Sequence, residues 1–164
     1  MVYCNYRIMV KFTEYIKKDV KKLDVVKEVK LLKYQMSLMK HMINAEEHPF
    51  FMFTIDHEFE ENQVNAFLKI LGVFSYRIKG EEIFEWYQND QLFSQFSLSL
   101  DKLYASEPPT LEELKMYVTK IFYQEFELEY LLCSLKKQFI QTEVCDFFLE
   151  AFKNRFEIND LRGF

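Results

Sequence analysis

The chain has 164 residues, of which 49% are hydrophobic and 18% aromatic, so it can bury a sizeable core and is not generally disordered. Only three Gly and three Pro occur, too few for the many tight turns of a β-sandwich or a doubly wound α/β fold. The net charge is −5. This composition favours an all-α protein, a multihelical bundle.

The charge is divided unevenly along the chain. Residues 1–43 hold ten Lys/Arg and four Asp/Glu, a net of +6, whereas residues 44–164 hold eleven and twenty-two, a net of −11. A basic arm on an acidic body suggests that the arm packs on the body, within or between subunits, or that it binds an acidic partner.

The sequence shows no recognisable signal peptide or membrane span, which predicts a cytoplasmic protein. Residues 1–12 carry charged residues among the apolar ones, unlike a signal peptide, and no apolar run approaches the roughly 18 residues of a membrane span. The cysteines, Cys4, Cys133 and Cys145, are unclustered, which suggests reduced core thiols rather than disulfides or a zinc site.

A long N-terminal helix is predicted over residues 13–44, which contain no Gly or Pro. Residues 1–12 alternate like a strand, but we take them as the irregular or helical start of this segment. Six apolar residues then follow heptad spacing and form a seam: Val25, Val29, Leu32, Met36, Met39 and Ile43. Such a seam packs either against a second copy of the helix, giving a homo-oligomer, or only against its own domain.

Further helices are expected over residues 49–58, 60–78, two pieces of 82–104, a segment from 110, 127–138 and 142–155. Pro49 suits a first helical turn and Gly80 a C-terminal cap. Thr110 and Glu113 form a predicted capping box, in which the Thr110 hydroxyl and the Glu113 carboxylate each bind an end amide. Thr142 is the predicted N-cap of the last helix.

Apolar stripes at helical spacing predict the buried faces of three of these segments. Gly72 is expected to weaken the middle of the first one. The stripes are Val64, Phe67, Leu68, Leu71, Phe74 and Ile78; then Phe93, Phe96, Leu100 and Leu103; and then Leu111, Leu114, Val118 and Ile121.

Three motifs in a fixed order carry a resemblance: Leu32-Lys33-Tyr34-Gln35 leading to Met42-Ile43, then His48-Pro49-Phe50-Phe51, then Phe59 to Val64. With the stretch from Phe126 to Phe152, they resemble the YhaI-like family of small helical Bacillus proteins of unassigned function. The resemblance covers residues 31–152. It implies a multihelical, oligomeric fold, and it implies no reaction or catalytic residues.

The resemblance also suggests a division of the chain. Residues 1–30 look like a basic N-terminal extension, 31–156 like the helical bundle domain and 157–164 like a tail. The region near 80–110 looks longer than in the family.

Polar residues cluster at two kinds of place in the sequence. The three histidines, His41, His48 and His57, lie near acidic residues at a helix junction, but none of their spacings is the i, i+4 pair that puts two ligands on one helical face. The acids Glu81, Glu82, Glu85, Glu112 and Glu113 stand where helix starts favour negative charge. No nucleophile or phosphate-loop motif is present. We therefore predict no cofactor, no metal and no enzyme activity.

Lys17, Lys18, Lys21 and Lys22 form a possible basic contact face. Such a face can bind nucleic-acid phosphates or anionic lipid, although a Lys-rich face is more often simply solvated. A helix-turn-helix in the last two helices is excluded by charge, because its recognition helix would present Glu143, Asp146 and Glu150 to DNA phosphates.

The aromatic residues Phe50, Phe51, Phe53, Trp86 and Tyr87 are expected mostly in the core, with any excess covered by an oligomer interface. Together these features predict a homo-oligomeric, non-enzymatic interaction or regulatory protein with a protein partner. The alternative is a nucleic-acid-binding accessory protein that uses the basic helix.

Overall fold

The fold was taken from a computed structural model, which describes residues 25–84 and 91–160. The chain divides into two compact units, residues 1–43 and 44–164. The described residues form seven α-helices and one short 3-10 helix, and no strand occurs among them. The predicted all-α fold is confirmed.

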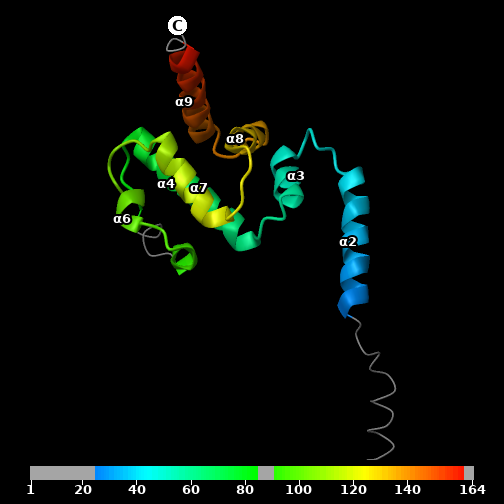
Figure 1. The fold of residues 1–164 in the computed structure, drawn as a ribbon. Coiled ribbons are helices and arrows are strands. Elements are labelled where there is room, and N and C mark those ends of the chain that lie inside the picture. The colour runs from blue at the N-terminus through cyan, green and yellow to red at the C-terminus, as the bar shows by residue number, and fades with distance from the viewer. Residues whose placement is uncertain (1–24, 85–90, 161–164) are drawn as a thin grey trace, which may run out of the picture. The chain divides into compact units, whose positions relative to one another are not determined.

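In the first unit the described element is α2, Val25–Met42 (Figure 1). It confirms the long helix for these residues, whereas residues 13–24 of the prediction lie outside the described part. The helix gives way to a turn at Asn44, whose Oδ1 accepts a hydrogen bond from the Glu46 amide at 3.0 Å. An Asn side chain that bonds the backbone two residues later stabilises a turn in place of further helix.

The second unit is a helical bundle (Figure 1). Its elements in chain order are α3 Pro49–Asp56, α4 Glu61–Lys79, η1 Gln91–Phe96, α6 Leu100–Leu103, α7 Leu111–Phe122, α8 Leu128–Lys137 and α9 Thr142–Asp160. Helix α4 lies at its centre, in contact with η1, α6, α7 and α9, while α8 packs on α3 and α9.

The ends of α3 and α4 follow the predicted signals. Pro49 occupies the first turn of α3, where its missing N–H is not needed. Gly80 ends α4 in the left-handed conformation, with φ of 67°. At the other end of α4, Gln63 Oε1 accepts from the Glu60 amide at 2.9 Å, and the Glu60 side chain completes a capping box. Helix α4 runs without a break through Gly72.

Two cap predictions were wrong in part. The Thr110 hydroxyl does accept from the Glu113 amide, at 3.2 Å, but the Glu113 carboxylate does not return to the helix end. It binds Arg77 instead, because a buried guanidinium is a stronger partner than a solvated amide. Thr142 is the first residue of α9 and not the cap before it; the preceding Gln141 has a φ of 49°.

The region predicted as two helical pieces within 82–104 is less helical than expected. Residues 81–84 are irregular, residues 85–90 lie outside the described part, and η1 and α6 have only six and four residues. Ser97 between them has a φ of 49°, which interrupts a right-handed helix. Phe93, Phe96 and Leu103 are nevertheless buried, so η1 and α6 pack apolar side chains against α4.

The predicted stripes form much of the core. Phe67, Leu71 and Phe74 of α4 are buried, as are all four stripe residues of α7, and Val64, Leu68 and Ile78 pack against them. Ala66, Ile70 and Val73 are also buried, because the central helix is covered on more than one face. Phe50 is buried, Phe53 is half-buried and Phe51 is exposed; Trp86 and Tyr87 lie outside the described residues.

Candidate functional site

The heptad seam lies on α2 and continues one residue beyond it. Five of its residues, Val25, Val29, Leu32, Met36 and Met39, are exposed by 43% to 61%, and Ile43 is half-buried. No residue of α2 is buried. A continuous row of exposed apolar side chains is uncommon on an ordinary protein surface and is typical of an interaction surface.

Outside the seam, α2 carries both apolar and polar side chains. Leu31, Leu38 and Met42 form a second exposed apolar row beside the seam. The remaining positions are largely polar and include four lysines, Lys27, Lys30, Lys33 and Lys40. The basic contact face predicted at Lys17, Lys18, Lys21 and Lys22 lies outside the described residues, as does Cys4.

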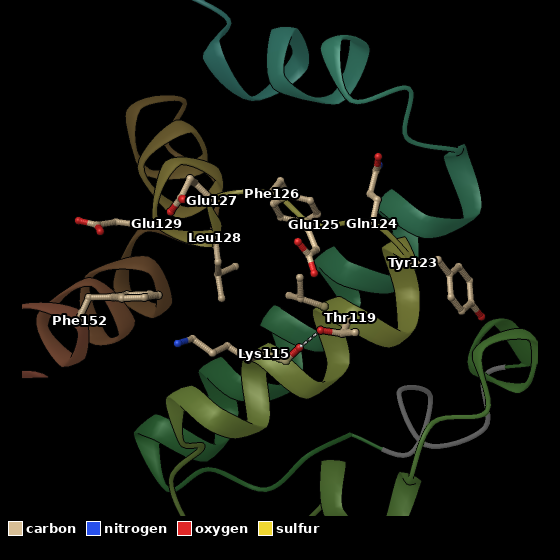
Figure 2. Close-up of a pocket in the computed structure, with 11 residues that line it drawn as sticks. Lys115, Thr119, Tyr123, Gln124, Glu125, Phe126, Glu127, Leu128, Glu129 and Phe152 are labelled. Atoms are coloured by element: carbon tan, nitrogen blue, oxygen red, sulfur yellow. Dashed lines mark hydrogen bonds between the residues drawn. The ribbon is translucent and has the colours of Figure 1, made fainter.

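In the second unit a groove of about 990 Å³ opens between α7, the segment that follows it, the start of α8 and one residue of α9 (Figure 2). Its apolar lining is Val118, Phe126, Leu128 and Phe152. Lys115 Nζ lies 5.2 Å from the centroid of the Phe152 ring, a cation–π contact at the groove wall. The sequence patterns did not predict this groove, because its walls come from three helices.

Two of the acidic residues that line the groove, Glu127 and Glu129, stand at the start of α8. Glu127 precedes the first residue of α8 and Glu129 stands in its first turn, where the helix dipole favours negative charge. Thr119 Oγ1 donates to the Lys115 carbonyl at 3.0 Å within α7. The lining residues, all in the described part, include no His or Cys that would act as a nucleophile or a general base.

Two of the three histidines lie within hydrogen-bond distance of a backbone carbonyl four residues earlier. His41 Nδ1 lies 2.7 Å from the Ser37 carbonyl, and His57 Nδ1 lies 2.9 Å from the Phe53 carbonyl. The His57 ring also stacks on the Phe53 ring, with centroids 4.0 Å apart. Within residues 25–84 and 91–160 no group of three His, Cys, Asp or Glu side chains is arranged to hold a metal ion.

Among the residues whose burial the structure describes, Arg77 and Glu113 are the two charged ones that are buried. Arg77 Nη1 and Nη2 donate to the two Glu113 carboxylate oxygens at 2.6 and 3.1 Å. Arg77 also donates to the backbone carbonyls of Lys102, Leu103 and Glu107 at 3.3, 3.2 and 2.8 Å. The pair thus ties the segment between α6 and α7 to α4, and with so many partners it is a structural device rather than a reactive one.

Arg77 was missed at the sequence level, although a signal was present. It stands three residues after Phe74 and seven after Ile70, both buried, so it lies on the buried face of α4. A buried Arg requires an acid, and Glu113 of α7 supplies it. Every buried side-chain nitrogen or oxygen atom in the described residues has a hydrogen-bond partner.

Two further titratable groups are held in their neutral forms. Burial, and secondarily the Glu113 charge, raise the pKa of Tyr117, whose hydroxyl donates to the Ser99 carbonyl at 2.9 Å. Burial, assisted by the Asp146 charge, raises the pKa of the Cys145 thiol to about 12. A buried neutral thiol is a poor nucleophile, so Cys145 serves the core.

Two of the three acids that argue against a helix-turn-helix, Glu143 and Asp146, form ion pairs with neighbouring helices. Glu143 of α9 pairs with Lys79 of α4 at 2.7 Å, and Asp146 of α9 pairs with Lys136 of α8.

In the part of the chain that the structure describes, no helix is long and apolar enough to cross a membrane.

Fold and surfaces together define an all-α protein that has a compact helical bundle and an N-terminal helix with an exposed apolar seam. A family model described as "Protein of unknown function (DUF1878)" matches residues 23–126, which is 104 of the 164 residues. The chain belongs to this family.

The family match covers α2 to α7 and stops before α8 and α9. It begins at residue 23 and ends at residue 126, whereas the motifs of the YhaI-like resemblance run from 31 to 152. No curated protein and no solved structure matches the chain.

Proposed function

We propose that this protein is a non-enzymatic interaction module that self-associates through α2. The observation that carries the proposal is the exposed seam, in which five of six apolar residues are exposed by 43% to 61%. Fully burying an exposed Val, Leu or Met side chain contributes roughly 1.5–3 kcal/mol, so covering these partly exposed side chains favours association. The homo-oligomer then presents its helical bundles to a protein partner.

Support for a binding role comes also from the polar groups of the bundle. The buried pair Arg77 and Glu113 is engaged in structural bonds, Cys145 is held as a neutral thiol, and the groove at Phe126 is lined mainly by apolar and helix-start residues. Enzymes instead gather polar groups with tuned acidity in a cleft. We place the module in the cytoplasm, because Cys133 and Cys145 are free thiols that suit a reducing compartment.

Equilibrium sedimentation of the full chain at tens of micromolar tests the proposal. The wild type is expected to be oligomeric, and Leu32→Glu to be monomeric because it places a charge in the seam. Tyr34→Glu is the matched control: Tyr34 is as exposed as Leu32, at 61%, and lies on the same helix but off the seam. A monomeric wild type would refute the proposal, and so would equal weakening by the two substitutions.

A second candidate is a nucleic-acid-binding accessory protein. It is favoured by the net charge of +6 on residues 1–43, including Lys17, Lys18, Lys21 and Lys22. Anisotropy of labelled DNA and RNA at low ionic strength tests it. Binding that weakens with salt and with Lys21→Glu plus Lys22→Glu would support this function, and no binding at low salt would remove it.

The family name can also be narrowed. The order of the motifs at Leu32, His48 and Phe59 supports the YhaI-like name for this chain within its broader family. A structure of an authenticated member that superposes on α3 to α9 would support the name, and a different helix order would contradict it.

A further inference from the structure

The heptad positions of the α2 seam are set by its spacing. Val29, Met36 and Ile43 occupy the a positions of the repeat, and Val25, Leu32 and Met39 occupy the d positions. Valine or isoleucine at a together with leucine at d favours two parallel strands over other arrangements. Val29, Ile43 and Leu32 fit that rule. Val25, Met36 and Met39 do not, so the orientation depends on the residues beside the seam.

The charged residues beside the seam distinguish a parallel from an antiparallel pair of α2 helices. Glu28, Gln35 and Met42 stand at g, and Val26, Lys33 and Lys40 stand at e. In a parallel, in-register pair, a g residue faces the e residue five positions later on the other helix. Glu28 therefore faces Lys33 of the second copy, and symmetry provides this opposite-charge pair twice.

An antiparallel pair lacks this complementarity. It places e beside e and g beside g, so the single acid of the flanks, Glu28, meets no lysine. The lysines at e, Lys33 and Lys40, would instead lie on the same flank of the seam as those of the second copy. Like charges at these positions disfavour the arrangement.

We infer that two copies of α2 pair as a parallel, in-register, two-stranded coiled coil in which Glu28 of each chain faces Lys33 of the other. This inference rests on the proposed function, since it requires self-association through the seam. It adds the orientation, the stoichiometry and the residues that select them. The bundles of the two copies then emerge from the same end of the coil.

Charge exchange on the full chain tests the pairing by equilibrium sedimentation at low salt. Glu28→Lys alone and Lys33→Glu alone should each weaken the dimer about tenfold, because attraction becomes repulsion at two places. The double variant E28K/K33E should restore wild-type affinity. Lys30→Glu, at a b position away from the interface, is the matched control and should leave the affinity unchanged within about twofold. In high salt these differences should shrink.

A cysteine cross-link reads the orientation independently. In a Cys4→Ser, Cys133→Ser, Cys145→Ala background, Val29→Cys alone should oxidise to a covalent dimer, because equal a positions meet in a parallel pair. Cross-linking only between Val29→Cys and Met39→Cys chains would overturn the inference in favour of an antiparallel pair.

The outcomes separate the inference from the function beneath it. A monomeric wild type defeats both. A dimer that the double variant fails to restore, or a trimer, overturns the inference and leaves self-association through the seam standing.

Discussion

Arg77 of α4 and Glu113 of α7 form a two-point ion pair inside the bundle, with N–O distances of 2.6 and 3.1 Å, although they stand 36 residues apart. Each is only 4% exposed. The Arg77 guanidinium also lies 5.3 Å from the centroid of the Phe74 ring. Because both charges are out of water, each depends on the other for its solvation.

Glu113→Gln is expected to reduce the free energy of unfolding by about 3 kcal/mol, because it leaves Arg77 as a buried charge without a counterion. Urea denaturation, monitored by circular dichroism, measures this loss. The dependence of the free energy of unfolding on urea concentration is expected to stay constant. Glu129→Gln is the control: it neutralises an exposed acid in the first turn of α8 and should change stability by less than about 0.5 kcal/mol. Equal losses in the two variants would contradict a special role for the pair.

Arg77→Lys keeps the charge and should still destabilise the protein, by at least about 2 kcal/mol. An ammonium group cannot reach the Glu113 carboxylate and the carbonyls of Leu103 and Glu107 together, as the guanidinium does. Amide hydrogen exchange should therefore rise in residues 103–110. Lys79→Met removes an exposed ion pair from the same helix and should cost less than about 1 kcal/mol without affecting that segment. Unchanged amide exchange in Arg77→Lys would show that the guanidinium does not stabilise residues 103–110.

Gly80→Ala should lower the free energy of unfolding by about 1–2 kcal/mol, because φ of 67° is unfavourable for a residue with a Cβ. A Cβ at this position would meet nothing within 4 Å, so the loss comes from the backbone and not from a clash. Gly80→Asn should lose less, since Asn tolerates the left-handed region. Thermal unfolding of the two variants compares them. An Asn variant as unstable as the Ala variant would point to a steric cause.

Alkaline pH should destabilise the bundle through Cys145. Its pKa is raised from an ordinary 9 to about 12 in the folded protein, so between these values the unfolded chain releases a proton that the folded chain keeps. The unfolded state then binds fewer protons, and the free energy of unfolding falls with a limiting slope of about 1.4 kcal/mol per pH unit for this one group. Tyr117 acts in the same direction, because burial raises its pKa too.

Urea denaturation at several pH values checks this, with Cys145→Ala expected to show a shallower decline above pH 9 than the wild type. Thiol labelling of the native protein in a Cys4→Ser background gives a second measurement. Cys133, which is partly exposed, should react before the buried Cys145. Faster labelling of Cys145 would contradict its protected state.

The seam shows how far sequence patterns reach. Its spacing predicted a helix through Val25 to Ile43, and α2 confirms the helix for Val25–Met42. The pattern also identified side chains that the structure leaves exposed. It could not identify what covers them, because an apolar row is equally suited to any apolar surface; self-association stays a prediction for the experiments above.

The all-α class, the positions of α3, α4, α7, α8 and α9, and much of the core contributed by α4 and α7 could be predicted from the amino-acid sequence. These follow from local rules: helical periodicity marks the buried face, and Pro49, Gly80 and Thr110 mark the ends.

Which distant polar groups meet depends on how the helices pack. Gln138, at the end of α8, accepts a hydrogen bond from the Phe50 amide of α3 at 3.0 Å, although the two residues are 88 positions apart. Arg77 binds the Glu113 carboxylate, which local rules assign to a helix cap. The physical reason is that apolar burial is non-directional and legible in periodicity, whereas a hydrogen bond or ion pair requires two specific atoms within about 3 Å. That proximity exists only once the helices have packed.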